Sequence, residues 1–302
     1  MSTETDQKPN PKIETKPNEL PKIPAGYADL GAVAGYNPPP PEKLNMLVVG
    51  PSNEGKSTFI NSTPRTMVLD FEKGSDSIID PKAIRIPIRD IAHYDKILAK
   101  LIADAKTGNR PFDRVAIDTG DEAAGMLSLW IANEKDIEDI AEYGREGHGW
   151  FLLRNRFMHR LRELNNAGYA WTIAGHIVEE KITDRKGKER LRIKPALFPS
   201  LYKSVLRLAS FEMTFYRLAK SQQRMKTIKH PTSGANIEVP DGDNVDVVET
   251  YYLDMRALDG EPGKKRGVPN MAGRFELPLV DGWQVFKDNY NRAVNELKGE
   301  SV

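Results

Sequence analysis

A glycine-rich segment near residue 50 has the residue types and the spacing needed to bind phosphate. The segment consists of Gly50, Pro51, Ser52, Asn53, Glu54, Gly55, Lys56, Ser57 and Thr58, in the spacing G-x-x-x-x-G-K-[ST]. Its glycines let backbone N–H groups turn inward around an anion, Lys56 can reach the β- and γ-phosphates, and Ser57 or Thr58 can offer a hydroxyl to Mg²⁺. An apolar run, 44–49, precedes the segment, and helix-compatible residues follow it. This context predicts a nucleoside triphosphate site at residues 50–58, with a chance glycine-rich turn as the alternative.

Acidic residues follow two further apolar runs. Asp118 ends the run 114–118 and is predicted, with Ser57, to hold Mg²⁺; a helix cap or turn residue is the alternative. The attacking water also needs an orienting base, and Thr119 occupies the position directly after Asp118. We therefore predict Glu72 as that base, since it lies just beyond the end of a strand, with a solvated loop acid as the alternative. The competing acids are Asp121 and Glu122.

Alternating strands and helices are expected to position these side chains. The predicted strands are 44–49, 66–70, 114–118 and 169–174, and the predicted helices are 93–105 and 150–166, the second closed by Gly168. Ligands gather at the carboxyl ends of strands in an open α/β sheet, so the glycine-rich segment, Glu72, Asp118 and His176 should share one edge. The fold class is therefore predicted as α/β, with a mainly parallel central sheet and helices on both faces.

The two ends of the chain differ in composition from its centre. Residues 1–43 contain nine of the 21 prolines and end in four consecutive prolines, so we predict a disordered tail that docks a partner or only solubilises. Residues 44–302 are predicted as one domain. Within it, the runs 224–230 and 245–256 predict a β-hairpin at the sheet edge, and 283–297 predicts a closing helix.

Composition excludes several classes of function. Zero cysteines rule out a disulfide framework, a zinc–thiolate site and a thiol nucleophile. No signal peptide or membrane-spanning run is recognisable, so we expect a soluble cytoplasmic protein without a membrane partner. The net charge of +1 says nothing by itself about nucleic acid.

Positive charge is concentrated between residues 181 and 229. This segment holds 14 basic residues against three acidic ones. Its first part, 181–194, is predicted to bind single-stranded DNA, with 185–188 in a flexible loop, because basic side chains neutralise phosphates and exposed aromatics stack on unpaired bases. The alternative is a solvated charged face, with the aromatic residues 198–216 in the core. The predicted DNA-binding residues are Lys181, Arg185, Lys186, Lys188, Arg190, Arg192 and Lys194.

Several short segments, in this order, resemble a known family. They are Gly50 to Thr58, Leu69 to Gly74, Asp118-Thr119, Glu142 to Gly144 with Trp150, Ala174 to His176, and Gly263 to Pro269. Together they resemble the phage nucleotide-binding proteins with a RecA-like core, most closely the single-strand annealing ATPases of the fourth Sak group, over roughly residues 44–279.

The resemblance implies a RecA-like P-loop ATPase that uses ATP and Mg²⁺. It implies that Glu72 is catalytic, that His176 senses the γ-phosphate where recombinases have Gln, and that Lys265 or Arg266 acts on a neighbouring subunit of a homo-oligomer. It also implies single-stranded DNA binding in phage recombination or annealing, in the host cytoplasm. For His176, a structural histidine is the alternative.

Two other functions stay open at this point. One is a nucleotide-gated DNA scaffold with negligible hydrolysis. The other is a small-molecule phosphotransferase, although no acceptor site is recognisable beside the basic segment. The sequence does not decide between ATP and GTP.

Overall fold

The computed structural model describes residues 22–73, 78, 81–145, 147–183, 189–231, 233–256, 264–278 and 280–299. The chain divides into two units, Met1–Pro38 and Pro39–Val302. In the first unit, residues 22–38 contain turns and no helix or strand, and the first half of the predicted tail, 1–21, lies outside the described residues. All of the described helices and strands belong to the second unit.

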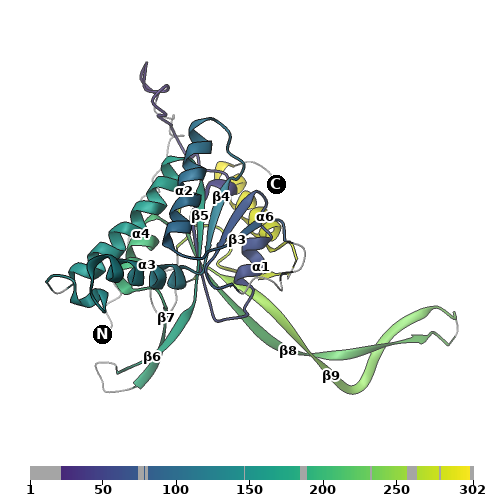
Figure 1. Ribbon diagram of the computed structural model, residues 1–302. Helices are drawn as coiled ribbons and strands as arrows, with labels where there is room; N and C mark the ends of the chain where they lie inside the picture. The colour runs from purple at the N-terminus through teal and green to yellow at the C-terminus, as the bar shows by residue number, and fades with distance from the viewer. Residues whose placement is uncertain are drawn as a thin grey trace, which may run out of the picture. The chain divides into compact units, whose positions relative to one another are not determined.

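An eight-stranded sheet forms the centre of the second unit (Figure 1). Its strands, in spatial order, are β10 (Arg274–Leu277), β9 (Asn236–Asp254), β8 (Phe211–Lys229), β1 (Met46–Val49), β5 (Ala170–Gly175), β4 (Arg114–Asp118), β2 (Thr66–Asp70) and β3 (Ile84–Pro87). The six strands from β8 to β3 are parallel, and β9 and β10 are antiparallel additions. Strands β1, β2, β4 and β5 are buried along their whole length, which is why consecutive apolar residues form the centre of each and no alternation with polar residues is seen. The predicted mainly parallel sheet is confirmed.

Helices cover both faces of the sheet (Figure 1). One face carries α2 (Ile91–Lys106), α3 (Gly120–Lys135), α4 (His148–Asn166) and α5 (Pro199–Leu208), and the other carries α1 (Lys56–Asn61) and α6 (Gly282–Lys298). Short 3₁₀ turns lie at Pro41–Lys43 and Ile140–Glu142. The three predicted helices are confirmed as α2, α4 and α6, whereas the sequence patterns do not predict α3 and α5. None of the helices in the described part of the chain has the length and apolar character needed to cross a bilayer.

The basic segment after His176 contains two strands that the sequence patterns do not predict. It forms an antiparallel pair, β6 (Ile177–Thr183) with β7 (Glu189–Pro195), and the predicted loop 185–188 lies outside the described residues. Basic and apolar residues alternate from 190 to 194, and this two-residue period is the signature of a strand. The basic residues on either side of the predicted loop therefore belong to paired strands.

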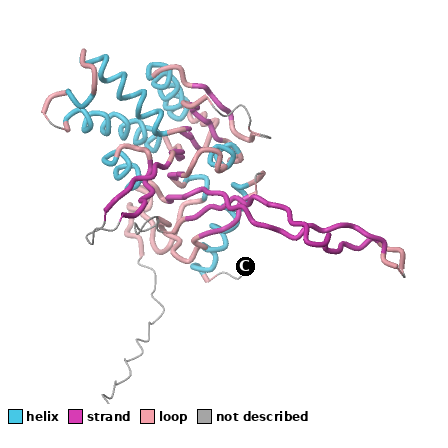
Figure 2. The backbone as a smooth tube through the Cα atoms, turned by 90° about the horizontal axis from the view of Figure 1, so that it is seen from below, coloured by secondary structure: helices cyan, strands magenta, loops and turns pink. Residues whose placement is uncertain are grey.

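The predicted hairpin at the sheet edge is present and is much longer than expected. Strands β8 and β9 have 19 residues each and remain paired from Thr214–Asp254 out to Lys229–Asn236. They pair with β1 and β10 only near the sheet, and beyond it they extend together as a twisted ribbon (Figure 2). We call this ribbon, residues 217–229 and 236–251, the arm. The aromatic residues at the start of β8 are core residues, since Phe211 and Phe215 are buried.

A buried guanidinium joins the amino ends of the strands to the segment that precedes them. Arg114 donates to the carbonyl oxygens of Pro41 (3.0 Å) and Leu44 (2.8 Å) and to the hydroxyl of Thr172 (2.8 Å). Its guanidinium also lies 5.3 Å from the ring centroid of Trp283 in α6. Arg114 thereby connects the chain entering β1, the strands β4 and β5, and the closing helix.

We expect Arg114→Leu to lower the free energy of unfolding by about 3–5 kcal/mol, because buried carbonyl groups would lose their charged donor. The control is Arg65→Leu, since Arg65 is exposed and pairs with Asp113 at 2.8 Å. Removal of that surface pair should cost about 1 kcal/mol or less. Urea unfolding of both variants checks this expectation, and equal destabilisation would contradict it.

Candidate active site

The glycine-rich segment forms a tight loop between β1 and α1. Gly55, at the start of α1, has φ +88°, and Asn53 has φ 64°, so two residues of the loop adopt the left-handed backbone conformation. A Cβ atom at Gly50 would lie 2.4 Å from the carbonyl oxygen of Phe215, which leaves room only for glycine beside β8. The loop thus has the backbone freedom that inward-facing N–H groups require.

Lys56 lies inside this loop. Its side chain is buried, and Nζ donates to the carbonyl oxygens of Gly50 (2.9 Å) and Pro51 (2.5 Å). Burial lowers the pKa of Lys56, while the negative charges of Asp118 and Glu72 act in the opposite direction. The ammonium group is therefore held at the loop by acceptors that phosphate oxygens can replace.

Asp118 faces the start of α1. Burial raises the pKa of Asp118 to about 6, although a hydrogen bond from Ser57 acts to lower it. Its Oδ1 atom is buried and has no hydrogen-bond partner. Among the described residues there is no cluster of three metal-ligating side chains, so a cation here would take its other ligands from phosphate and water. An unsatisfied carboxylate oxygen beside a serine hydroxyl fits Mg²⁺.

His176 lies between two carboxylates at the end of β5. Its Nδ1 is 2.8 Å from Oδ2 of Asp121, and its Nε2 is 3.7 Å from Oε1 of Glu72. The hydrogen bond with Asp121 raises the pKa of His176, against the effect of burial. Burial would raise the pKa of Asp121, but the bond and charge of His176 hold it below its usual value. The imidazole therefore links the predicted base to the first turn of α3.

The spatial order of the strands explains this convergence. Strand β5 lies between β1 and β4. Strand β1 leads into the glycine-rich loop 50–58, which we call the phosphate loop, and β4 ends in Asp118. Strand β2 lies on the other side of β4. The carboxyl ends of these four adjacent strands therefore bring Lys56, His176, Asp118 and Glu72 together. Asp121, considered in the sequence only as a competing base, is the hydrogen-bond partner of His176. Its position in the first turn of α3 could have indicated this role, had that helix been predicted.

The structure places Lys265 and Arg266 away from this site. Lys265 forms a β-bridge with Phe211, the first residue of β8, and its Nζ donates to the carbonyl oxygens of Pro269 (3.3 Å) and Met271 (2.6 Å). Because the phosphate loop follows the opposite end of the parallel strand β1, neither residue lies near the candidate site. Lys265 is engaged by its own loop, whereas the side chain of Arg266 is exposed.

The predicted DNA-binding residues lie on or beside the β6–β7 hairpin. Lys181 is exposed on β6, and Lys194 on β7 pairs with Glu180 at 2.8 Å. Arg190 and Arg192 belong to β7. The remaining three residues, Arg185, Lys186 and Lys188, lie outside the described residues. Strand β6 begins at the residue after His176, so this hairpin is continuous with the end of β5.

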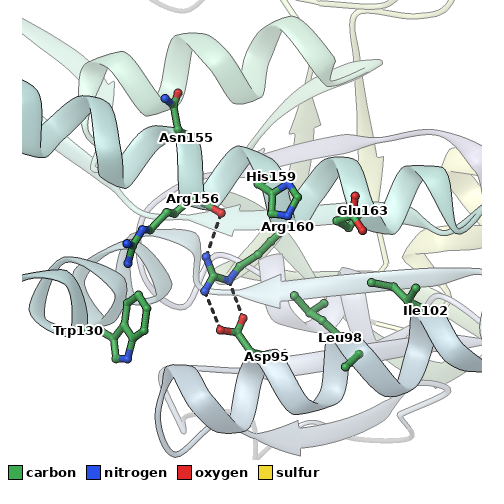
Figure 3. A pocket seen from close by; sticks show the side chains of 10 residues that line it. Asp95, Leu98, Ile102, Trp130, Asn155, Arg156, His159, Arg160 and Glu163 are labelled. Carbon is green, nitrogen blue, oxygen red and sulfur yellow. Dashed lines mark hydrogen bonds and ion pairs between the residues drawn. The ribbon is translucent and has the colours of Figure 1, made fainter. Parts of the chain in front are cut away.

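A groove of about 550 Å³ lies between α2 and α4, apart from the predicted site residues (Figure 3). Two arginines of α4 connect the helices that line the groove. The guanidinium of Arg160 makes two 2.8 Å hydrogen bonds to Asp95 in α2, and Arg156 pairs with Glu134 in α3. Arg156 also stacks on Trp130, 4.9 Å from its ring centroid. These contacts join helices, and no side chain in the groove is among those predicted for catalysis.

We expect Asp121→Asn to lower the pKa of His176, because the variant has no charged hydrogen bond to raise it. In the wild type, this pair contributes full stability between about pH 3.8 and pH 6.5, the ordinary pKa values of its two members. The contribution is lost as pH rises through the raised pKa of His176, or falls through the lowered pKa of Asp121. NMR titration of the imidazole protons measures the shift, and an unchanged His176 pKa in the variant would contradict the expectation.

The chain matches a known protein family. A family model described as AAA domain matches residues 42–234, which include the phosphate loop, Glu72, Asp118, His176 and the β6–β7 hairpin. No curated protein matches the chain. Among solved structures, a KaiC-like protein from the hyperthermophilic archaeon Pyrococcus horikoshii OT3 is similar at 11% identity and a TM-score of 0.34, over 80% of this chain and 89% of that one. Since the family match spans more than half of the chain, the protein belongs to the AAA domain family, a family of P-loop ATPases.

Proposed function

We propose that the protein hydrolyses ATP with Mg²⁺ at the carboxyl edge of β1, β5, β4 and β2, and that this reaction is coupled to single-stranded DNA on the β6–β7 hairpin. The observation that carries the proposal is the convergence of a buried lysine, a buried aspartate with an unsatisfied oxygen, and a glutamate–histidine pair beside one phosphate loop. Each group has a place in phosphoryl transfer to water.

In this proposal, Lys56 exchanges its carbonyl acceptors for the β- and γ-phosphate oxygens. Ser57 and Asp118 hold Mg²⁺, which when bound neutralises charge on the phosphates. Glu72 accepts a proton from the water that attacks the γ-phosphorus, while the bond to the β–γ bridging oxygen breaks and ADP and phosphate form. Its side chain is 45% exposed and therefore accessible to that water. Asp121 raises the pKa of His176, whose imidazole donates a hydrogen bond to the γ-phosphate. This hydrogen bond is lost when the γ-phosphate leaves.

DNA coupling follows from the continuity of β5 and β6. A change at His176 is transmitted directly into β6, the first strand of a hairpin whose basic residues would contact phosphates of the DNA strand. The proposal includes a homo-oligomer in which Arg266 completes the site of a neighbouring copy, because its own site lies at the other end of the sheet. A role in recombination or annealing of the phage type, and a partner for the proline-rich tail, belong to the same proposal.

We expect Glu72→Gln to bind ATP as tightly as the wild type and to turn over about 10²–10⁴-fold more slowly, since the amide cannot accept the proton. Equilibrium binding and phosphate release are measured on the same preparation. Glu122→Gln is the matched control, because Glu122 is an exposed acid of the same region. Full turnover in the Glu72 variant would remove Glu72 from the mechanism, and binding without turnover in the wild type would favour a nucleotide-gated scaffold.

We expect the double change Lys181→Glu and Lys194→Glu to weaken single-stranded DNA binding. The magnitude of the slope of log K against log salt should fall by about 0.7 for each DNA phosphate that the hairpin no longer neutralises. ATP binding without DNA should not change. The control alters the same number of charges, Lys100→Glu and Lys96→Glu, on exposed positions of α2. Equal weakening in both double variants would mean that only net charge matters and would exclude the hairpin as the DNA site.

A further inference from the structure

Glu54, inside the phosphate loop, has a largely buried carboxylate that the proposed reaction does not use. Its side chain is only 13% exposed, and its Oε2 atom has no hydrogen-bond partner. Its Oε1 atom is 3.6 Å from Nε of Arg217. A carboxylate in this loop opposes the binding of phosphate unless a cation neutralises it. Arg217 is placed to be that cation.

Arg217 lies at the root of the arm. The pairing of β8 with β1 ends at Thr214, three residues before Arg217. On the other side, Nη1 of Arg217 is 2.7 Å from Oε2 of Glu249 in β9. The guanidinium therefore spans from the phosphate loop to the second strand of the arm, and Glu249 fixes its orientation.

Two further contacts reach the same loop from the arm root, the end of β8 and β9 next to the sheet, residues 215–217 and 249–251. The carbonyl oxygen of Phe215 lies against Gly50, at the start of the loop. The ring of Tyr251, from β9, would lie 3.3 Å from a Cβ atom at Gly55, at the end of the loop. Strand β1 and helix α1 are covalently continuous with the two ends of the loop. In addition, Phe215, Arg217 and Tyr251 of β8 and β9 lie beside its start, middle and end.

We infer that Arg217 is a positioning residue for the phosphate loop, and that the arm root sets the affinity of this loop for nucleotide. The inference rests on the proposed nucleotide site. A loop that binds anions through backbone N–H groups works only when those groups converge, so a displaced Glu54 would disturb both the geometry and the local charge. Arg217 contacts no reacting atom in this arrangement, and its effect is on binding.

The test compares Arg217→Gln with Arg224→Gln. Arg224 is a matched control, because it lies on the same strand of the arm and forms an ion pair with Asp246 at 2.6 Å, beyond the loop. We expect Arg217→Gln to raise the Kd for ADP in Mg²⁺ and the KM for ATP about fivefold, with kcat changed less than twofold. Arg224→Gln should leave all three unchanged, and thermal unfolding should be the same in both variants.

A second change separates positioning from a general disruption of structure. In Glu54→Gln with Arg217→Gln, the carboxylate that needed neutralising is gone, so most of the affinity for ADP should return. Equal Kd values for Arg217→Gln and Arg224→Gln, or additive weakening in the double variant, would overturn the role of Arg217. Failure of the wild type to bind ADP would instead refute the proposed nucleotide site, so the two failures are distinguishable.

Discussion

The parallel register of β1, β5, β4 and β2 is the constraint on which the candidate site depends. Parallel strands end at one edge, so four segments separated by long stretches of sequence deliver their last residues to the same place. Because β5 is inserted between β1 and β4, His176 at its end joins the same site and contacts Glu72 and Asp121. At the opposite ends of the strands, Arg114 of β4 bonds to Thr172 of β5 and to the chain that enters β1.

Burial gives the site its electrostatic character. Lys56 and Asp118 are both withdrawn from water, which disfavours each charge, and each charge favours the other. His176 and Asp121 form a similar pair, in which the shifts of the two pKa values show mutual stabilisation. The site therefore contains positive and negative groups whose hydrogen-bonding capacity is not fully used, most clearly at Oδ1 of Asp118. A bound cation and phosphates would complete it. Glu54 and Arg217 extend this network behind the loop.

The sequence was sufficient to predict the central strands and the residues at their ends, because fully buried strands appear as apolar runs that stop at glycine or acid. Helix α3 was missed because alanines such as Ala123 and Ala124 form much of its buried face, so its apolar stripe is weak. Strands β6 and β7 were missed because charged residues interrupt their apolar residues, so no apolar run marks either strand. The contacts of His176 with Asp121, 55 residues away, and of Glu54 with Arg217 depend on tertiary structure and have no local signal.

Phosphate release from ATP, with and without single-stranded DNA, tests the central claim most directly, and Lys56→Ala is the control. Lys56 is the group that the structure holds inside the phosphate loop. We expect Mg²⁺-dependent release that rises with DNA and disappears in the variant. Release that persists in Lys56→Ala would contradict a reaction at this loop. Release that requires Lys56 but is indifferent to DNA would keep the ATPase and contradict the coupling.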